Sequence, residues 1–283
     1  MEAVSKNIYS GNNYYMKKRC IICLKNKFSL LKTFLNINYY RCENCNFHFQ
    51  TTPKKINYKI KKYHNYNDKF GQKRFQLQIN EVKERAENWY GDIINFINNL
   101  KRKKVKILDY GSGPGHLLNF INSKYKYCFE LNKSHKLHIR NNYKSVKILN
   151  NPFKKQYSDY FDVIVFYHVI EHVEKPAHIL MKLKKILKKN GILIVGTPNI
   201  DSIGYKLFRG NFRLFDKEHL YMFGEKSLTM MLEKFNFKIF KKEFPFFKTN
   251  YFNLKNLFLM LLLWKVSPPF YKNVMTYYCT KRD

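Results

Sequence analysis

Four cysteines in two matched pairs are the first residues whose spacing suggests chemistry. Cys20 and Cys23 form one C-x2-C pair, and Cys42 and Cys45 form a second after eighteen intervening residues. Two residues between thiolates let a tight turn aim both sulfurs at one ion, and two such turns complete the tetrahedral site that structural zinc prefers. The spacing therefore predicts a zinc ribbon with no open position for water. Disulfides are the alternative, which a reducing compartment disfavours.

A glycine-rich turn followed by a carboxylate is the second candidate site. Gly111, Gly113 and Gly115 lie between a predicted strand and an amphipathic helix, and Glu130 ends the next predicted strand, seventeen residues after Gly113. Glycines here let the backbone turn sharply and approach a ligand closely, and a carboxylate at that strand end can accept hydrogen bonds from both hydroxyls of a ribose. The glycines recur at every second residue, unlike the G-x-G-x-x-G dinucleotide fingerprint, so no pyrophosphate cradle is predicted.

An alternation of strands and helices must position these residues. After Lys104, short apolar runs alternate with amphipathic segments, which is typical of βαβ units and a mostly parallel sheet. We expect a zinc ribbon module at residues 1–57, a helical linker at 58–103 and an α/β domain at 104–283. Strands are expected at residues 105–110, 125–130, 146–149, 161–167, 191–196, 237–240 and 274–280. Helices are expected to bury Ile179 to Leu187, Leu228 to Phe235 and Leu254 to Trp264.

The chain is strongly basic, with 53 Lys and Arg against 20 Asp and Glu and a formal net charge of +33. Such an excess attracts phosphate-rich partners. The abundance of residues with A/T-rich codons favours a genome-wide base bias over selection for RNA binding. Residues 1–20 lack the apolar stretch of a secretory signal, and the longest apolar run, Leu257 to Trp264, is shorter than the ~20 residues of a membrane helix. We expect a cytoplasmic protein without a transmembrane segment, with peripheral membrane contact left open.

The segment LDYGSGPGHLL at residues 108–118 resembles the first motif of the class I S-adenosylmethionine-dependent methyltransferases. The resemblance continues with FDVIVFYHVIEHVEKP at 161–176, GILIVGTPN at 191–199 and DKEHLYMFGEKSLTMMLEKFNF at 216–237. Towards the N-terminus, CIIC, RCENCNFHFQTTPK and KKYHNYNDKF are similar to the zinc-ribbon head of a subset associated with sugar, surface-polysaccharide or natural-product modification. The resemblance implies a doubly wound, Rossmann-like sheet of seven strands, mostly parallel with an antiparallel last strand.

By this resemblance, the glycine turn would wrap the methionine part of S-adenosylmethionine, with Asp109 near its amino group and Glu130 on the ribose. The family commonly has an acidic residue after the third strand to read the adenine amino group, whereas this chain has Asn150 and Asn151 there. The cofactor-binding residues that the resemblance implies are Asp109, Gly111, Ser112, Gly113, Gly115, Glu130, Leu131, Asn151, Tyr167 and His168.

Methyl transfer from a sulfonium is an in-line displacement, so the protein must align an acceptor and, for hydroxyl or carbon acceptors, remove its proton. His172, and His219 next to Glu218, fall in segments that border the substrate pocket in related enzymes. Histidine is largely neutral yet basic near pH 7. His219 is the preferred base, with Glu218 orienting it or binding substrate, and the pair resembles a Glu-His pair of zinc-headed sugar carbon-methyltransferases. Purely structural roles for both histidines are the alternative.

These observations predict methylation of a small molecule, namely a sugar, nucleotide-linked sugar or glycan precursor. A ribosomal or transfer RNA methyltransferase with a zinc ribbon is the runner-up, which the basic charge supports and the lack of an Asn-Pro-Pro-Tyr-like tetrapeptide opposes. A non-catalytic RNA-binding scaffold is a third hypothesis, against which the intact glycine turn and Glu130 argue.

Overall fold

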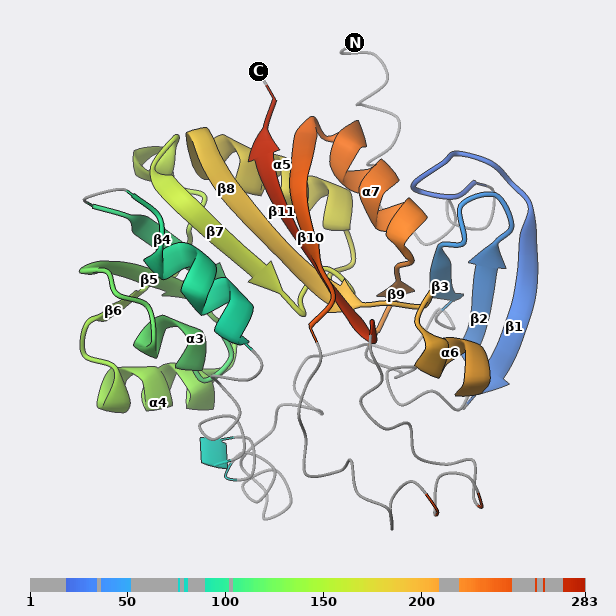
Figure 1. The fold of residues 1–283 in the computed structure, drawn as a ribbon, viewed down its shortest axis with the longest axis horizontal. Coiled ribbons are helices and arrows are strands. Elements are labelled where there is room, and N and C mark those ends of the chain that lie inside the picture. The colour runs from blue at the N-terminus through green and yellow to red at the C-terminus, as the bar shows by residue number, and fades with distance from the viewer. Residues whose placement is uncertain are drawn as a thin grey trace.

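Short buried runs in the second half of the chain pair into one seven-stranded sheet (Figure 1). The structure, a computed structural model, describes residues 19–34, 37–51, 76, 79–80, 90–101, 104–208, 219–245, 258, 262 and 272–282. In chain order the strands are β4 (Lys106–Tyr110), β5 (Tyr125–Phe129), β6 (Val146–Ile148), β7 (Phe161–Tyr167), β8 (Leu187–Pro198), β10 (Phe237–Glu243) and β11 (Val274–Lys281). Their order in the sheet is β10-β11-β8-β7-β4-β5-β6.

The sheet is mostly parallel, as the sequence predicts. Strands β4, β5, β6, β7 and β8 pair in parallel, whereas β11 runs antiparallel to β8 and β10 runs antiparallel to β11. All seven residues of β7 are buried, which is the pattern of a central strand covered on both faces. The antiparallel last strand of the prediction is confirmed.

Helices cover both faces of the sheet, which makes the fold doubly wound. One buried cluster joins the sheet to α5 (Pro176–Ile186) and α7 (Glu225–Lys234). A second cluster joins the other face to the helix over residues 90–98, α3 (His116–Asn119) and α4 (Lys133–Asn142). Two short helical segments, η1 (Lys155–Tyr157) and α6 (Ile203–Phe208), lie in connecting loops.

Several boundaries differ from the sequence prediction: β5 ends at Phe129, β6 ends at Ile148 and β10 extends to Glu243. Leu187, expected on the helix face, begins β8 instead, because α5 ends at Ile186 and Leu187 pairs with Phe161 of β7. Of the expected helix at 254–264 the structure describes only Phe258 and Leu262, both helical, and the rest lies outside the described residues. Among the residues that the structure describes, no helix has both the length and the apolar character to cross a membrane.

A smaller antiparallel sheet stands beside the large one (Figure 1). It contains β1 (Phe28–Phe34), β2 (Ile37–Cys42) and β3 (His48–Thr51), and its fourth strand, β9 (Tyr221–Met222), comes from the second half of the chain. The predicted boundaries at residues 57 and 103 lie outside the described residues, so the division into three parts stays a prediction.

The strand order places a candidate binding site at the carboxyl end of β4. The chain proceeds from β4 to β5 and β6 on one side and then crosses to β7 on the other side. Loops leaving β4 and β7 therefore diverge, and this is where open α/β sheets bind ligands.

Candidate functional site

The glycine turn is tied to the end of β5 by its backbone. The N–H groups of Gly111 and Ser112 donate hydrogen bonds to the carbonyl oxygen of Phe129, at 2.8 and 3.3 Å. Gly111 has φ 83°, and a Cβ there would lie 2.4 Å from a methyl carbon of Val169 in the loop after β7. Gly113 has φ 53°, and a Cβ there would meet nothing within 4 Å. The turn is thus closed against the protein at Gly111 and open at Gly113, where a ligand can approach.

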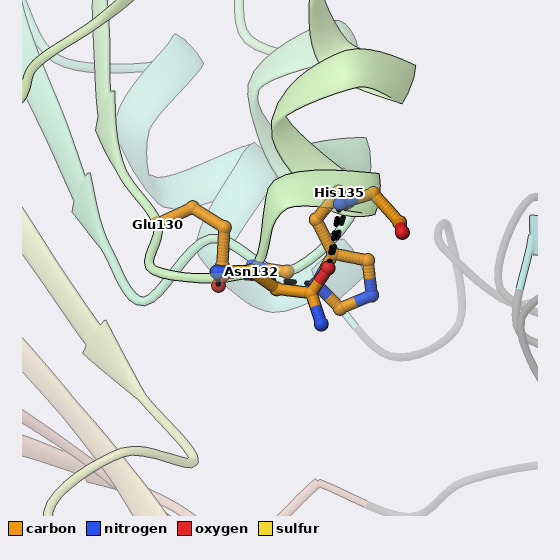
Figure 2. A network of polar contacts seen from close by, with 5 residues as sticks. Glu130, Asn132 and His135 are labelled. Carbon is orange, nitrogen blue, oxygen red and sulfur yellow. Dashed lines mark hydrogen bonds and ion pairs between the residues drawn. The ribbon is translucent and has the colours of Figure 1, made fainter. Parts of the chain in front are cut away.

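Glu130 turns its carboxylate towards this loop. Its Oε2 atom accepts a hydrogen bond from the N–H of Gly113 at 2.8 Å, and its Oε1 atom accepts one from the N–H of Asn132 at 2.7 Å. Nδ1 of His135 lies 3.9 Å from Oε2 (Figure 2). Burial alone would raise the pKa of Glu130, but His135 and these two N–H groups outweigh it and lower the pKa. The glycine turn and the carboxylate therefore converge, as the spacing predicts.

Asp109 lies at the end of β4 and is nearly fully buried. Burial, and secondly the negative charge of Glu130, raise its pKa to about 7. A cationic group placed beside Asp109 would favour the ionised form and relieve this cost. Asp109 therefore fits the amino group of a bound amino acid, such as the methionine part of S-adenosylmethionine.

The residues predicted to contact adenine border the next strand end. Asn151 is exposed, and its Oδ1 accepts a hydrogen bond from the N–H of Phe153 at 2.9 Å, which caps the local turn. Asn150 and Asn151 line a cavity of about 270 Å³ after β6. Leu131 is 60% exposed. Neither Glu130 nor Leu131 lines that cavity, so the adenine contacts of Leu131 and Asn151 stay predictions.

Tyr167 and His168 occupy the end of β7. The ring of Tyr167 packs on Gly196, where an added Cβ would lie 2.0 Å from it. The centroids of the Tyr90 and His168 rings lie 5.6 and 4.8 Å from its own. His168 adopts φ 54°, a left-handed conformation that is uncommon outside glycine. Its N–H donates to the carbonyl oxygen of Gly196 at 2.8 Å, and its Nδ1 lies 3.1 Å from Oε1 of Glu171.

Glu171 is a site residue that the sequence reasoning missed. It is fully buried, and its Oε2 accepts a hydrogen bond from Oγ1 of Thr197 at 3.1 Å. Burial would raise its pKa, but the hydrogen bond from His168 and the nearby imidazoles of His168, His172 and His219 outweigh burial and lower it to about 2. Its place between predicted residues, in the segment I-E-H, is the signal that could have identified it.

His172 and His219 come together although they are far apart in the sequence. Their rings are 4.7 Å apart in an edge-to-face arrangement, with His172 exposed and His219 half-buried. Glu218, the predicted partner of His219, lies outside the described residues. Within the part of the chain that the structure describes, the carboxylate beside both histidines is that of Glu171.

The same three groups are also potential metal ligands. One ligand atom each of Glu171, His172 and His219 lie within 4.8 Å of one another. A zinc ion with ligands at about 2.1 Å would need atoms roughly 3 to 4 Å apart, so the side chains would have to move closer to hold a cation. As they stand, the three side chains form a polar cluster that follows β7.

The four cysteines converge as predicted. Cys20 and Cys45 have sulfurs 3.6 Å apart, and Cys23 and Cys42 have sulfurs 3.5 Å apart. A tetrahedral zinc ion with Zn–S bonds of about 2.3 Å sets sulfurs roughly 3.8 Å apart, so the donor set fits zinc. A hydrogen bond with Cys45 lowers the pKa of Cys20 to about 5, whereas the same hydrogen bond raises the pKa of Cys45 and burial raises the pKa of Cys42, so the shifts favour a thiolate at Cys20 alone of these three.

The glycine turn and the cluster of Glu171, His172 and His219 are connected by the loop after β7. Val169 packs against Gly111, and His168, Glu171 and His172 belong to the same loop. The cluster of Glu171, His172 and His219 is therefore connected to the glycine turn through Val169.

A scan of protein families matches residues 82–242 to a methyltransferase domain. The chain is 26% identical over 160 residues to the ubiquinone biosynthesis O-methyltransferase of Glaesserella parasuis serovar 5, covering 47% of this chain and 68% of that protein. Among solved structures, it is similar to a Thermotoga maritima S-adenosylmethionine-dependent methyltransferase described as a possible histamine N-methyltransferase. The TM-score is 0.54 at 21% identity, covering 78% of this chain and 99% of the other.

A second structural relative is the plantazolicin methyltransferase BpumL, solved with a desmethyl plantazolicin analogue and S-adenosylhomocysteine. The TM-score is 0.53 at 15% identity, and the match covers 78% of this chain and 93% of the other. Identities this low support the shared fold alone.

Proposed function

The chain belongs to the methyltransferase domain family as a class I S-adenosylmethionine-dependent enzyme, and we propose that it methylates a small molecule, namely a sugar, nucleotide-linked sugar or glycan precursor. One observation supports this proposal most strongly. The cluster of His172, His219 and Glu171 borders the glycine turn through Val169, so proton acceptors lie beside the place of the reactive methyl group. A hydroxyl or carbon acceptor needs such a group.

The cofactor would be held by the residues that the sequence predicts. Bound S-adenosylmethionine supplies a methyl group carried on a positively charged sulfur. The open side of Gly113 admits the methionine part, and Asp109 binds its amino group. Glu130 keeps further lone pairs for the ribose hydroxyls besides those used by Gly113 and Asn132. Ser112, Gly115, Leu131, Asn151, Tyr167 and His168 complete the proposed pocket.

His219 is the proposed base. His172 lies beside it and would contact the acceptor. A neutral imidazole accepts the acceptor proton as the methyl group moves, and the anionic Glu171 stabilises the imidazolium that forms. Glu171 thus supplies, within the described residues, the carboxylate that the sequence assigned to Glu218. The four cysteines would hold a structural zinc ion, and we propose the cytoplasm as the location.

Transfer of labelled methyl from S-adenosylmethionine to a panel of nucleoside diphosphate sugars, with total RNA as the second arm, tests the function. We expect label in the sugar arm, a fall of about 100-fold or more in His219→Ala, and unchanged calorimetric binding of S-adenosylhomocysteine by that variant. Unchanged turnover in His219→Ala would remove this residue from the base role.

RNA is the second candidate, since the net charge of +33 favours phosphate-rich partners. Label in the RNA arm, with binding that weakens steeply between 50 and 200 mM salt, would replace the small-molecule proposal.

A further inference from the structure

The zinc module and the segment that carries His219 share one sheet. Strand β9 pairs antiparallel with β3, so that His48 faces Met222 and Phe49 faces Tyr221. His219 lies two residues before β9. The strand that follows the second cysteine pair is therefore the direct neighbour of the segment holding the proposed base.

Gln50 fixes this segment at two consecutive residues. Its backbone N–H donates to the carbonyl oxygen of Leu220 at 3.0 Å, and its side-chain Nε2 donates to the carbonyl oxygen of His219 at 3.1 Å. Gln50 is 5% exposed, so competition from water for these carbonyls is small. The side chain of Gln50 thus constrains the backbone from which the imidazole of His219 projects.

The opposite side of the segment is fixed by the loop after β7. The N–H of Tyr221 donates to the carbonyl oxygen of Glu171 at 3.2 Å, and the hydroxyl of Tyr221 donates to the carbonyl oxygen of Glu174 at 2.8 Å. Residues 219–221 are therefore held between the zinc module and the loop that carries His172.

The module is itself anchored close to its metal ligands. The N–H of Cys42 donates to the carbonyl oxygen of Phe47 at 2.8 Å, and the ring of Phe47 packs on Tyr221 and Phe223 with centroids 5.5 and 5.2 Å apart. Asn46 donates through Nδ2 to Oδ1 of Asp201 at 2.8 Å. The cysteine turn, β3 and β9 therefore form one continuous set of contacts.

We propose that Gln50 is a positioning residue for His219, and that the metal-bound module holds the proposed base in register with the acceptor. The inference rests on the proposed function, because it assumes that His219 removes the acceptor proton. Gln50 acts through the backbone of His219 and touches neither cofactor nor acceptor. The zinc module then serves methyl transfer directly, in addition to stabilising its own fold.

The first test is Gln50→Met, which keeps the side-chain volume and removes the donor. We expect amide hydrogen exchange over residues 219–223 to speed up about fivefold, the factor that one lost hydrogen bond supplies, while β2 exchanges as before. Labelled methyl transfer to the nucleoside diphosphate sugar panel should fall about tenfold, with S-adenosylhomocysteine binding unchanged. The matched control is Gln76→Met, because Gln76 is exposed and its side chain donates to Asn80.

Removal of zinc by a chelator is the second arm. We expect residues 219–223 to lose exchange protection together with β3, while S-adenosylhomocysteine still binds at the glycine turn. Faster exchange throughout β2 and the large sheet in Gln50→Met would show a general loss of stability and overturn the positioning role. Unchanged exchange at 219–223 and full transfer in Gln50→Met would also overturn it. If His219→Ala alone retains full transfer, the proposed base fails instead.

Discussion

Exchange of Glu171 for Gln removes one negative charge from a fully buried position between three imidazoles. The pKa of Glu171 is lowered from an ordinary 4.5 to about 2, because the hydrogen bond from His168 and the imidazoles of His172 and His219 outweigh burial. At about 1.4 kcal/mol for each unit, this difference corresponds to roughly 3 kcal/mol of folding stability. A glutamine keeps the shape and one carbonyl oxygen but loses that charge.

The sign of the pH dependence follows from the lowered pKa. Since the folded-state value lies below 4.5, the stabilisation is fully present above pH 4.5 and is lost as the pH falls towards 2. Glu171→Gln should therefore have a free energy of unfolding lower by about 3 kcal/mol at pH 5, where imidazoles of ordinary pKa about 6.5 are charged, and the gap to the wild type should narrow as the pH falls to 3.

Urea unfolding followed by circular dichroism at pH 7, 5, 4 and 3 measures this gap. Glu174→Gln is the matched control, because Glu174 is exposed and only its backbone carbonyl accepts the bond from Tyr221. Its free energy of unfolding should change by less than about 0.5 kcal/mol. Equal stability of Glu171→Gln and wild type at pH 5, or a gap that does not depend on pH, would refute the electrostatic account of this cluster.

Three further outcomes are expected. Glu130→Ala should weaken calorimetric binding of S-adenosylhomocysteine by about 10- to 100-fold, because hydrogen bonds to a charged group contribute about 1.5 to 3 kcal/mol, and unaltered affinity would exclude a ribose contact. Cys45→Ser should lower the zinc content measured by mass spectrometry and destabilise β1 to β3 in hydrogen exchange, whereas retention of one zinc per chain would contradict the four-sulfur site. Added Zn²⁺ should inhibit methyl transfer by occupying the lone pairs of His172 and His219. Stimulation that disappears in His172→Ala would instead make these groups metal ligands and remove His219 from the base role.

Local sequence patterns were sufficient to predict most of the seven-stranded sheet. Every strand predicted after Lys104 is present. The central strand β7 is a short apolar run covered on both faces, whereas β10, at the sheet edge, alternates buried and more exposed residues. The start of β8 was missed because Leu187 is equally suited to a helix face and to a buried strand, and only its pairing with Phe161 decides between them.

The candidate site also has a part that the sequence predicted and a part that it did not. The glycine turn and Glu130 could be joined from the sequence, since parallel strands bring successive carboxyl ends to one edge and the spacing fixes which residues meet there. The segment I-E-H places Glu171 beside His172, but only the tertiary structure shows that Thr197 and three histidines surround its carboxylate.

The sequence by itself predicted that the four cysteines converge, that strands and helices alternate in a mostly parallel sheet, and that the cofactor is S-adenosylmethionine, because these depend on residues close together along the chain. Tertiary structure alone decided that His172 meets His219 and that Gln50 bonds to the backbone of His219. Those contacts join segments separated by 47 and 169 residues, and their formation depends on how β3 and β9 pair and how the loop after β7 packs. Spacing along the chain does not predict contacts between such distant segments, because the free energy that stabilises these contacts comes from burial across the whole core.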